Sequence, residues 1–319
     1  SCSIITSGGD LFIYSEDAEA DTLLIITATC QQGTLVAIVN AITGQTVQVK
    51  TLDTVAKAAF RLSLASSEHH KKRSPIALVS SSSFTTQVQV FPEGDLALVK
   101  QQLTTVYFHV IDKRAGTITG YSWQVTSSAT VAQQIWSHAF EKQAKIISVA
   151  EHASPLNEHI ASVVHLTGNG DVLHKYLNPH LFAIATLTSI QDKEEQAKNV
   201  DVYLIEGVSG DIIYRAAHAS CDGPVNLLLD ENFLVYHYLN EKQKRFELSV
   251  VEMFTNDTSI EQPLVNAVLN LNTRAKHFSV FGMERPFILR QAFVFPTAVN
   301  TIATTRTRVG ITGKMLVCK

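Results

Sequence analysis

The sequence lacks the features of several common protein classes. No stretch approaches the ~20 consecutive apolar residues that span a bilayer as a helix, and the chain does not open with a signal peptide. Neither charge sign dominates, since 26 Lys and Arg stand against 29 Asp and Glu, so nothing favours a nucleic-acid partner. The chain opens within a strand-like pattern, SCSIITSGGDLFIY, and we therefore expect a fragment of a longer protein.

Cysteine is scarce. The four cysteines are Cys2, Cys30, Cys221 and Cys318, and no two of them have CxxC spacing, which disfavours a structural zinc site. Their even number permits disulfides without requiring them. A closed ring of sheets would bring the two ends of the chain together, but sequence spacing leaves the pairing of the four cysteines open.

Motifs of the common catalytic classes are also missing, because no G-x-S-x-G elbow, P-loop or dinucleotide fingerprint occurs. Twelve histidines are present. The segment EHASPLNEHI holds His152, Glu158 and His159, but their spacing does not match a zinc-protease helix and Pro155 interrupts it. We expect no catalytic residue, no metal site and no cofactor, and predict that the chain is not an enzyme.

What the sequence does contain is a long series of short β-forming bursts. Each has four to six residues, the usual length of a strand, and is bounded by Gly, Asp, Asn or Ser. Two segments, 53–64 and 131–145, instead suggest helices, although the second could equally be a loop before a strand at 146–150. The predicted strands cover residues 11–14, 23–26, 35–39, 76–79, 106–111, 202–205, 233–238 and 248–251.

A hairpin pattern recurs along the chain. In each copy a strand runs into a polar turn, a glycine and a second strand. Glycine suits the turn because it adopts a positive φ at little cost. The copies are IVNAITGQTVQV, VIDKRAGTITGY, HLTGNGDVLHKY and LIEGVSGDIIYR, with turn glycines Gly44, Gly116, Gly170 and Gly210.

These hairpins predict an all-β fold, and specifically a β-propeller of the PQQ or WD40 type. Gly170 and Gly210 are 40 residues apart, the spacing of one four-stranded blade. At roughly 40 residues per blade, 319 residues give about eight blades, with seven as the alternative. We expect one propeller domain over residues 1–319. A sandwich or barrel would also contain such hairpins, but radial repetition protects the edge strands of so many short strands.

Three polar or irregular stretches are predicted to be insertions: residues 63–74, 189–201 and 269–286. The first contains the basic cluster HHKKR, which we interpret as a solvated loop. One N-x-[ST] sequon occurs, at Asn256, in the polar turn FTNDTSIEQP, and it is a candidate glycosylation site if the protein enters the secretory pathway. Near the end of the chain, the sequence predicts a strand at 293–295, a break at Pro296 and a second strand at 301–308. Strand alternation places Arg306 and Arg308 on one face, where they would pair with carboxylates or face a partner.

Three segments together resemble a known family. They are DVLHKYLNPHLFAIAT at 171–186, the long stretch at 202–254 that contains EGVSG and VYHYLN, and RQAFVFPTAVNTIATTRTRVGIT at 290–312. These segments are similar to subunit one of the endoplasmic reticulum (ER) membrane protein complex. The similarity is strong over the last half of the chain, whereas the first half matches in its hairpin style. Val309 departs from the family pattern, which has Arg directly before Gly-Ile-Thr.

The resemblance implies a pair of stacked propellers in the ER lumen, followed by a membrane helix that this chain lacks. It also implies a complex that inserts tail-anchored and multi-pass membrane proteins, in which this subunit is a non-catalytic scaffold. The implied partners are the other subunits, together with client membrane proteins or lumenal chaperones. The parent would be a single-pass ER membrane protein.

Two alternatives remain. The segment VIDKRAGTITGYSW loosely resembles the tryptophan-docking repeat of quinoprotein propellers, which bind pyrroloquinoline quinone over a metal. Only Trp123 and Trp136 are present, so that repeat is not sustained. The second alternative is a peptide-binding propeller unrelated to the complex.

Overall fold

The computed structural model describes most of the chain. Among its described residues, no helix is both long and apolar enough to cross a membrane. The described residues are 11–16, 22–30, 33–62, 64, 72–81, 85–125, 131–141, 144–152, 160, 162–170, 172–191, 196–255, 285–305 and 313–319.

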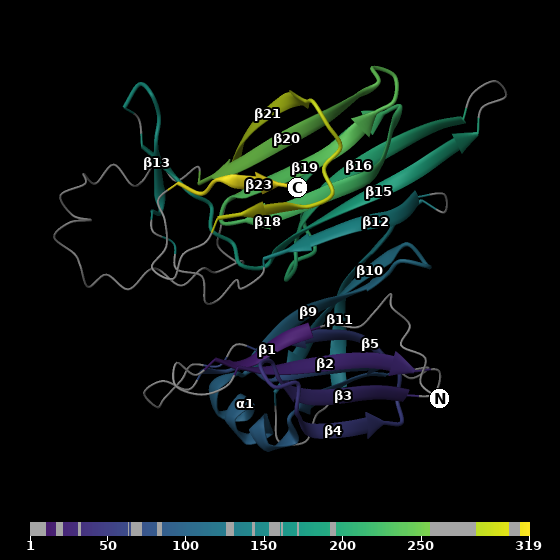
Figure 1. The fold of residues 1–319 in the computed structure, drawn as a ribbon, viewed down its shortest axis with the longest axis vertical. Helices are drawn as coiled ribbons and strands as arrows, with labels where there is room; N and C mark the ends of the chain where they lie inside the picture. Colours follow the sequence, from purple (N-terminus) through teal and green to yellow (C-terminus); the bar gives the residue numbers. More distant parts are fainter. Residues whose placement is uncertain are drawn as a thin grey trace. The chain divides into compact units, whose positions relative to one another are not determined.

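The chain divides into two compact units (Figure 1). Unit 1 comprises residues 1–111 and 118–137, and unit 2 comprises 112–117 and 138–319. Antiparallel strands dominate both units, which confirms the all-β prediction. A single domain over 1–319 stays a prediction, and so does the number of blades.

Unit 1 is built on two sheets. Their strand orders are β4-β3-β2-β1-β6 and β5-β7-β8-β11-β10-β9. A short 3-10 turn, Glu93–Asp95, leads into the helix α1, Leu96–Gln102. The strands are β1 Leu11–Glu16, β2 Leu23–Cys30, β3 Gly33–Asn40, β4 Thr46–Leu52, β5 Ala56–Arg61, β6 Lys72–Arg73, β7 Ile76–Ser81, β8 Thr86–Phe91, β9 Thr105–Asp112, β10 Thr117–Gln124 and β11 Val131–Ala139.

Unit 2 contains two four-stranded sheets, with orders β12-β15-β16-β17 and β18-β19-β20-β21. Two further hairpins, β13-β14 and β22-β23, form small sheets of their own. The strands are β12 Ala144–Glu151, β13 Val164–Leu166, β14 Val172–His174, β15 Leu181–Gln191, β16 Gln196–Glu206, β17 Ile212–Ala219, β18 Cys221–Asp230, β19 Phe233–Asn240, β20 Arg245–Phe254, β21 Phe287–Phe295, β22 Ile302–Thr304 and β23 Leu316–Cys318.

The four predicted hairpins are all present, as β3-β4, β9-β10, β13-β14 and β16-β17. Each turn glycine adopts the left-handed conformation that the sequence predicted. Their φ angles are 70° at Gly44, 65° at Gly116, 91° at Gly170 and 80° at Gly210. The hairpin pattern therefore correctly predicted both the four hairpins and the positive φ of their turn glycines.

The core of unit 2 lies between its two larger sheets. On the central strand β16, Val200, Val202 and Leu204 alternate into one cluster with Tyr236 and Met253. The intervening Tyr203 and Ile205 are buried as well. A central strand covered on both faces reads as a nearly continuous apolar run, which explains why VDVYLIE stands out in the sequence.

Both helix predictions were wrong. Residues 53–64 contain strand β5, and 131–145 contain strand β11 and the start of β12. The amphipathic spacing there reflects strands with one exposed face, as in the burial alternation of β11. The single described helix, α1, was missed because its seven residues are too few for a clear helical period.

Two of the three predicted insertions contain strand residues where loops were expected, whereas residues 63, 65–71, 192–195 and 269–284 lie outside the described residues. In 189–201, residues up to Gln191 and from Gln196 onward are paired strand, because β15 and β16 keep full register to Gln191↔Gln196. Lys72 and Arg73 of the basic cluster form β6 against β1. In both cases polar residues are paired in strands near the border of a sheet. There the amino-acid composition does not distinguish a strand from a loop.

A substitution at Gly120 tests how tightly unit 1 is packed. A Cβ at Gly120 on β10 would overlap the indole of Trp136. We expect Gly120→Ala to lower the free energy of unfolding by about 1–3 kcal/mol, because overpacking forces the ring or strand to shift. Urea titration of the isolated chain measures this. Gly94→Ala is the control, since an added Cβ there meets nothing within 4 Å and should change stability by less than about 0.5 kcal/mol. Equal effects of the two substitutions would contradict the expectation.

Candidate functional site: an anchored C-terminal hairpin

The residues singled out by the sequence do not form a described site. Asn256, Arg306, Arg308 and Val309 lie outside the described residues. Within the described part of the chain, no group of three or more His, Cys, Asp or Glu side chains could hold a metal ion. Cys221 is buried and Cys318 exposed, and both are free thiols. Cys2 and the side chain of Cys30 are not described.

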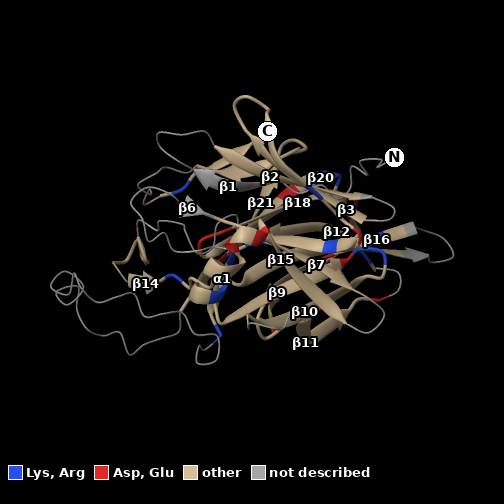
Figure 2. Ribbon diagram, turned by 90° about the horizontal axis from the view of Figure 1, so that it is seen from below, with Lys and Arg blue, Asp and Glu red and all other residues tan. Residues whose placement is uncertain are grey.

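The structure instead draws attention to the turn between β18 and β19. Asp230 pairs with Phe233, so Glu231 and Asn232 form a two-residue loop. Asp230, Glu231 and Asn232 are all buried, although the turn is made entirely of polar residues. Figure 2 shows that charged residues make up a small part of the described ribbon, and Asp230 and Glu231 are among the few of them that are buried.

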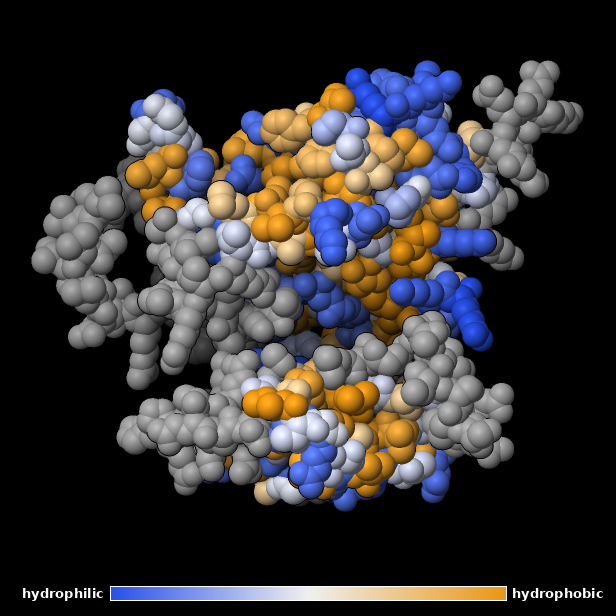
Figure 3. All heavy atoms as spheres, in the orientation of Figure 1, coloured by the Kyte–Doolittle hydropathy of each residue, from blue (hydrophilic) through white to orange (hydrophobic). Residues whose placement is uncertain are grey.

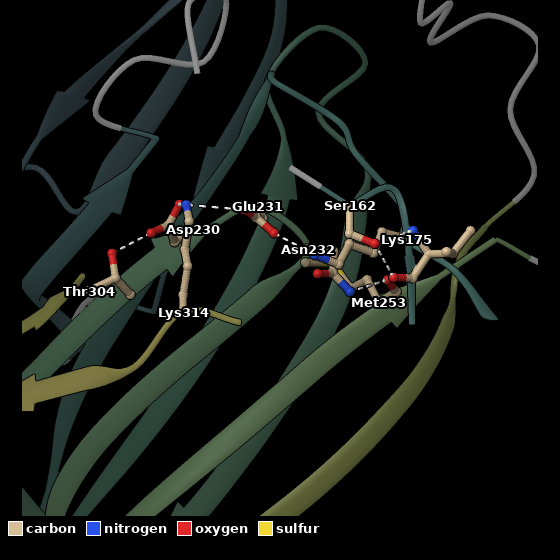
Figure 4. A network of polar contacts seen from close by, with 9 residues as sticks. Ser162, Lys175, Asp230, Glu231, Asn232, Met253, Thr304 and Lys314 are labelled. Carbon is tan, nitrogen blue, oxygen red and sulfur yellow. Dashed lines mark hydrogen bonds and ion pairs between the residues drawn. The ribbon is translucent and has the colours of Figure 1, made fainter. Parts of the chain in front are cut away.

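Two lysines neutralise the two buried carboxylates (Figure 4). Lys175 Nζ lies 2.6 Å from Glu231 Oε2. Lys314 Nζ lies 2.8 Å from Asp230 Oδ1 and 3.2 Å from Glu231 Oε1. The Thr304 hydroxyl donates a hydrogen bond to the other oxygen of Asp230. The cluster therefore balances two negative with two positive charges away from water, which a buried charge requires.

Glu231 is held in an unusual backbone conformation. Its φ is 42°, in the left-handed region that a residue with a Cβ enters at a cost of order 1–3 kcal/mol. Such a residue persists only when its surroundings fix it. Here the two lysines bind its two carboxylate oxygens, and the side-chain amide of Asn232 donates to the Met253 carbonyl at 2.9 Å. The turn geometry thus depends on contacts that come from elsewhere in the chain.

The cluster joins three segments of unit 2 that are far apart in sequence. Lys175 follows β14 and forms an isolated bridge with Phe254, at the end of β20. Thr304 ends β22, and Lys314 precedes β23. The network therefore fixes the β13-β14 hairpin and the β22-β23 hairpin to the sheet that contains β18 and β19.

The anchored C-terminal hairpin has one buried and one exposed side. Val299 and Ile302 pack against Val235 and Leu248 of the sheet. On the outer strand, Met315, Leu316 and Val317 are exposed. Exposed apolar side chains on an element that is fixed in place are candidates for an interaction site.

A buried histidine lies where β21 ends. His237 stacks on Phe246 at 5.2 Å between centroids, and its Nε2 is 3.3 Å from the Thr297 carbonyl. Its Nδ1 is buried and has no hydrogen-bond partner in the described part of the chain. Burial lowers the pKa of His237 below its ordinary value, and the Thr297 bond opposes that shift. The imidazole is therefore kept neutral, with Nε2 donating its proton to Thr297.

Two of the segments that carry the family resemblance meet in unit 2. The loop before β15 contains Asn178 and His180, and the β16-β17 turn contains Glu206 and Gly207. The Gly207 N–H donates to the His180 carbonyl at 2.9 Å, and a Cβ on Gly207 would lie 2.8 Å from that oxygen. Glu206 caps its own turn by accepting from the N–H groups of Val208 and Ser209. These motif residues therefore fit a structural role in closing the sheet.

The predicted last strands are confirmed in part. Phe293–Phe295 belongs to β21, and Pro296 follows its end. The strand predicted from Thr301 to Arg308 is described only as β22, Ile302–Thr304. Sequence analysis missed the ionic cluster altogether. The one local signal was the run Asp230-Glu231-Asn232 between two strongly apolar strands, which reads as an ordinary solvated turn.

Comparison with known proteins identifies a family whose model matches nearly the whole chain. The family model described as ER membrane protein complex subunit 1, second beta-propeller, matches residues 7–319. The propeller predicted from the hairpins is thereby confirmed, and the matching family model is that of a second β-propeller.

Three proteins with the name ER membrane protein complex subunit 1 are similar to the chain. That of Xenopus laevis is 29% identical over 238 residues, which make up 72% of this chain and 22% of the relative. That of Gallus gallus is 27% identical over 241 residues, with the same coverages. That of Schizosaccharomyces pombe is 25% identical over 237 residues, covering 71% and 24%. The chain thus spans about a fifth to a quarter of the length of these relatives.

Solved structures resemble the chain only distantly. Kluyveromyces lactis Hsv2 aligns over 74% of this chain and 79% of its own, with 11% identity and a TM-score of 0.26. The WD40 domain of SCAP from fission yeast aligns over 77% and 61%, with 7% identity and a TM-score of 0.24.

The ionic cluster can be tested by removing one charge. Lys314→Met keeps the length of the side chain but leaves Asp230 buried without its cation. The Lys314 and Asp230 side chains are 6% and 0% exposed, so we expect a loss of about 3–5 kcal/mol in the free energy of unfolding. Lys50→Met is the control, because Lys50 pairs with a Glu93 that is 73% exposed, and its loss should cost less than about 1 kcal/mol. Chemical denaturation compares the two variants, and comparable losses would contradict the assignment.

His237 makes the stability of the fold depend on pH. Its pKa in the folded chain lies below the unfolded value of about 6.5, so the unfolded chain binds the proton first. The stability that neutral His237 contributes is complete above about pH 6.5 and falls as the pH drops below it, by at most about 1.4 kcal/mol per pH unit. We expect His237→Gln to reduce the stability difference between pH 7.5 and 5.5. An unchanged difference in His237→Gln would refute the prediction.

Proposed function

Because the chain belongs to the family described as ER membrane protein complex subunit 1, second beta-propeller, we propose that it is a non-catalytic scaffold domain of that complex in the ER lumen. The observation that carries this proposal is the family match, which extends over residues 7–319. The proposed partners are the other subunits of the complex. Client membrane proteins and lumenal chaperones are further candidates.

The physical mechanism we propose is architectural. Antiparallel sheets with buried cores form a rigid frame, and loops and outer strands on such a frame present contact surfaces in fixed positions. The anchored hairpin β22-β23 is such an element. The buried ion pair of Lys314 with Asp230 fixes it to the sheet, and Met315 and Val317 are exposed to solvent. By positioning other subunits, the domain would support the insertion of tail-anchored and multi-pass membrane proteins. In a lumenal setting Asn256 would be a candidate for glycosylation, and Arg306 and Arg308 would be candidates for contact with a partner.

A quinoprotein-like dehydrogenase is the rival from another functional class. The two tryptophans support a structural reading instead. Trp123 is buried in the core of unit 1, and Trp136 covers Gly120 of the neighbouring strand. A stoichiometric spectral change on adding pyrroloquinoline quinone and Ca²⁺ would favour the dehydrogenase over the scaffold.

Co-purification of the full-length parent tests the proposal. We expect the tagged parent to recover the other subunits from ER membranes, and we expect recovery to fall at least tenfold when this domain is deleted. The matched control is the parent without a deletion that carries the surface substitution Lys50→Met, which should leave the recovery of the other subunits unchanged. Recovery of no other subunit with the intact parent would overturn the scaffold function. It would then favour the second rival, an unrelated peptide-binding propeller.

A further inference from the structure

We propose that the outer edge of β21, which no described strand covers, is a docking site at which an extended segment of another subunit of the complex adds to the sheet as a further strand. This inference rests on the proposed function, because the occupant is a subunit of the same complex. It goes further in naming the element that binds and the backbone chemistry that selects an extended chain.

The first observation is the geometry of the edge. β21 pairs with β20 over nine consecutive residues, from Phe295↔Phe246 to Phe287↔Phe254, without a bulge. Among the described strands, none pairs with its other side. An edge strand presents a row of N–H and C=O groups that another strand can satisfy in register. At about 3.4 Å per residue, this row is about 30 Å long.

The second observation is the side chains along that edge. Phe287, Leu289 and Phe293 share one face of β21, and Val294 lies on the other, and all four are exposed. Figure 3 shows that apolar surface gathers over the part of unit 2 that contains β21 and β23. Exposed aromatic residues on a rigid element are the type enriched in protein interfaces.

The third observation is the lack of protection. Natural edge strands are usually short, bulged, charged or interrupted by proline. The terminal strand β4 of unit 1 shows these devices, since its register against β3 shifts at Ile38/Val39 and its Lys50 pairs with Glu93. β21 is longer and regular, and Arg290 is its one charged residue. An edge of this kind is suited to strand addition, which is a common mode of peptide recognition.

The chemistry of the edge indicates its occupant. A partner segment needs apolar side chains on the face shared with Phe287 and Phe293, and an acidic residue near Arg290 on the other. Arg290 is exposed and forms no ion pair with a described residue. A second copy of β21 fits less well. Antiparallel self-pairing centred on Gln291 would place apolar residues opposite one another, but it would also bring the two Arg290 side chains onto one face as diagonal neighbours without an acid.

Photo-crosslinking of the assembled complex is the first test. A photoreactive residue replaces Val294 in the full-length parent, and the same residue at Val49 on β4 is the matched control. The two valines are 60% and 55% exposed, each on a terminal strand. We expect position 294 to crosslink to one subunit, at a segment with alternating apolar residues and an acid, and position 49 to give no such adduct. An adduct between two copies of this chain, or no adduct at 294, would overturn the proposal.

A charge substitution and hydrogen exchange provide the second test. A synthetic peptide of the crosslinked segment should bind the chain and slow amide exchange in β21 by at least tenfold. Val294→Lys should weaken binding at least tenfold, whereas Val49→Lys should not change it. Equal melting temperatures of the two variants would show that the fold is intact. Binding without slower exchange in β21 would replace strand addition with another mode of contact.

These outcomes separate the inference from the function on which it rests. If the parent recovers the other subunits but position 294 gives no adduct and Val294→Lys has no effect, the edge proposal fails and the scaffold function stands. If the parent recovers no subunit at all, both fail.

Discussion

The C-terminal half of the chain depends on two lysines that neutralise two carboxylates at the β18-β19 turn. Burying either charge alone would cost several kcal/mol, and the cluster avoids this because Lys175 and Lys314 reach Asp230 and Glu231 from opposite directions in the sequence. A hydrophobic patch would hold the same segments together less specifically, because apolar contacts have little directional preference. The ion pairs instead fix both hairpins to one turn.

A rigid frame with few charges and several exposed apolar strands fits a protein that works by holding others in place. The sheets of unit 2 bury their central strands on both faces, and the side-chain amides of Asn226 and Asn232 donate hydrogen bonds to backbone carbonyl groups. Exposed apolar residues then occur on outer strands, where the sheet cannot cover them itself. In a protein of a multi-subunit complex these uncovered strands are the natural places for contacts with other chains.

Sequence analysis was most successful where a single residue type reports the local backbone. The four turn glycines marked four hairpins, and each adopts a positive φ. The two helix predictions were wrong because half-exposed strands such as β11 carry apolar residues on the exposed face as well, so residue polarity does not alternate along the strand although burial largely does. The ionic cluster could not be predicted, since Lys175 and Lys314 are 139 positions apart and nothing in either neighbourhood indicates that they meet at one turn. Long-range polar contacts are set by the fold, and composition does not record them.

The position of Lys314 also determines where the domain can be cut. The described part of this end of the chain, Thr305 and residues 313–319, looks dispensable, since it contains only the three-residue strand β23 and no buried hydrophobic residue. A shorter chain that stopped before Lys314 would nevertheless leave Asp230 uncompensated inside a turn built around it. Expression boundaries for this domain, and breakpoints for any chimera with a related protein, therefore belong beyond residue 314, however peripheral the last strand looks.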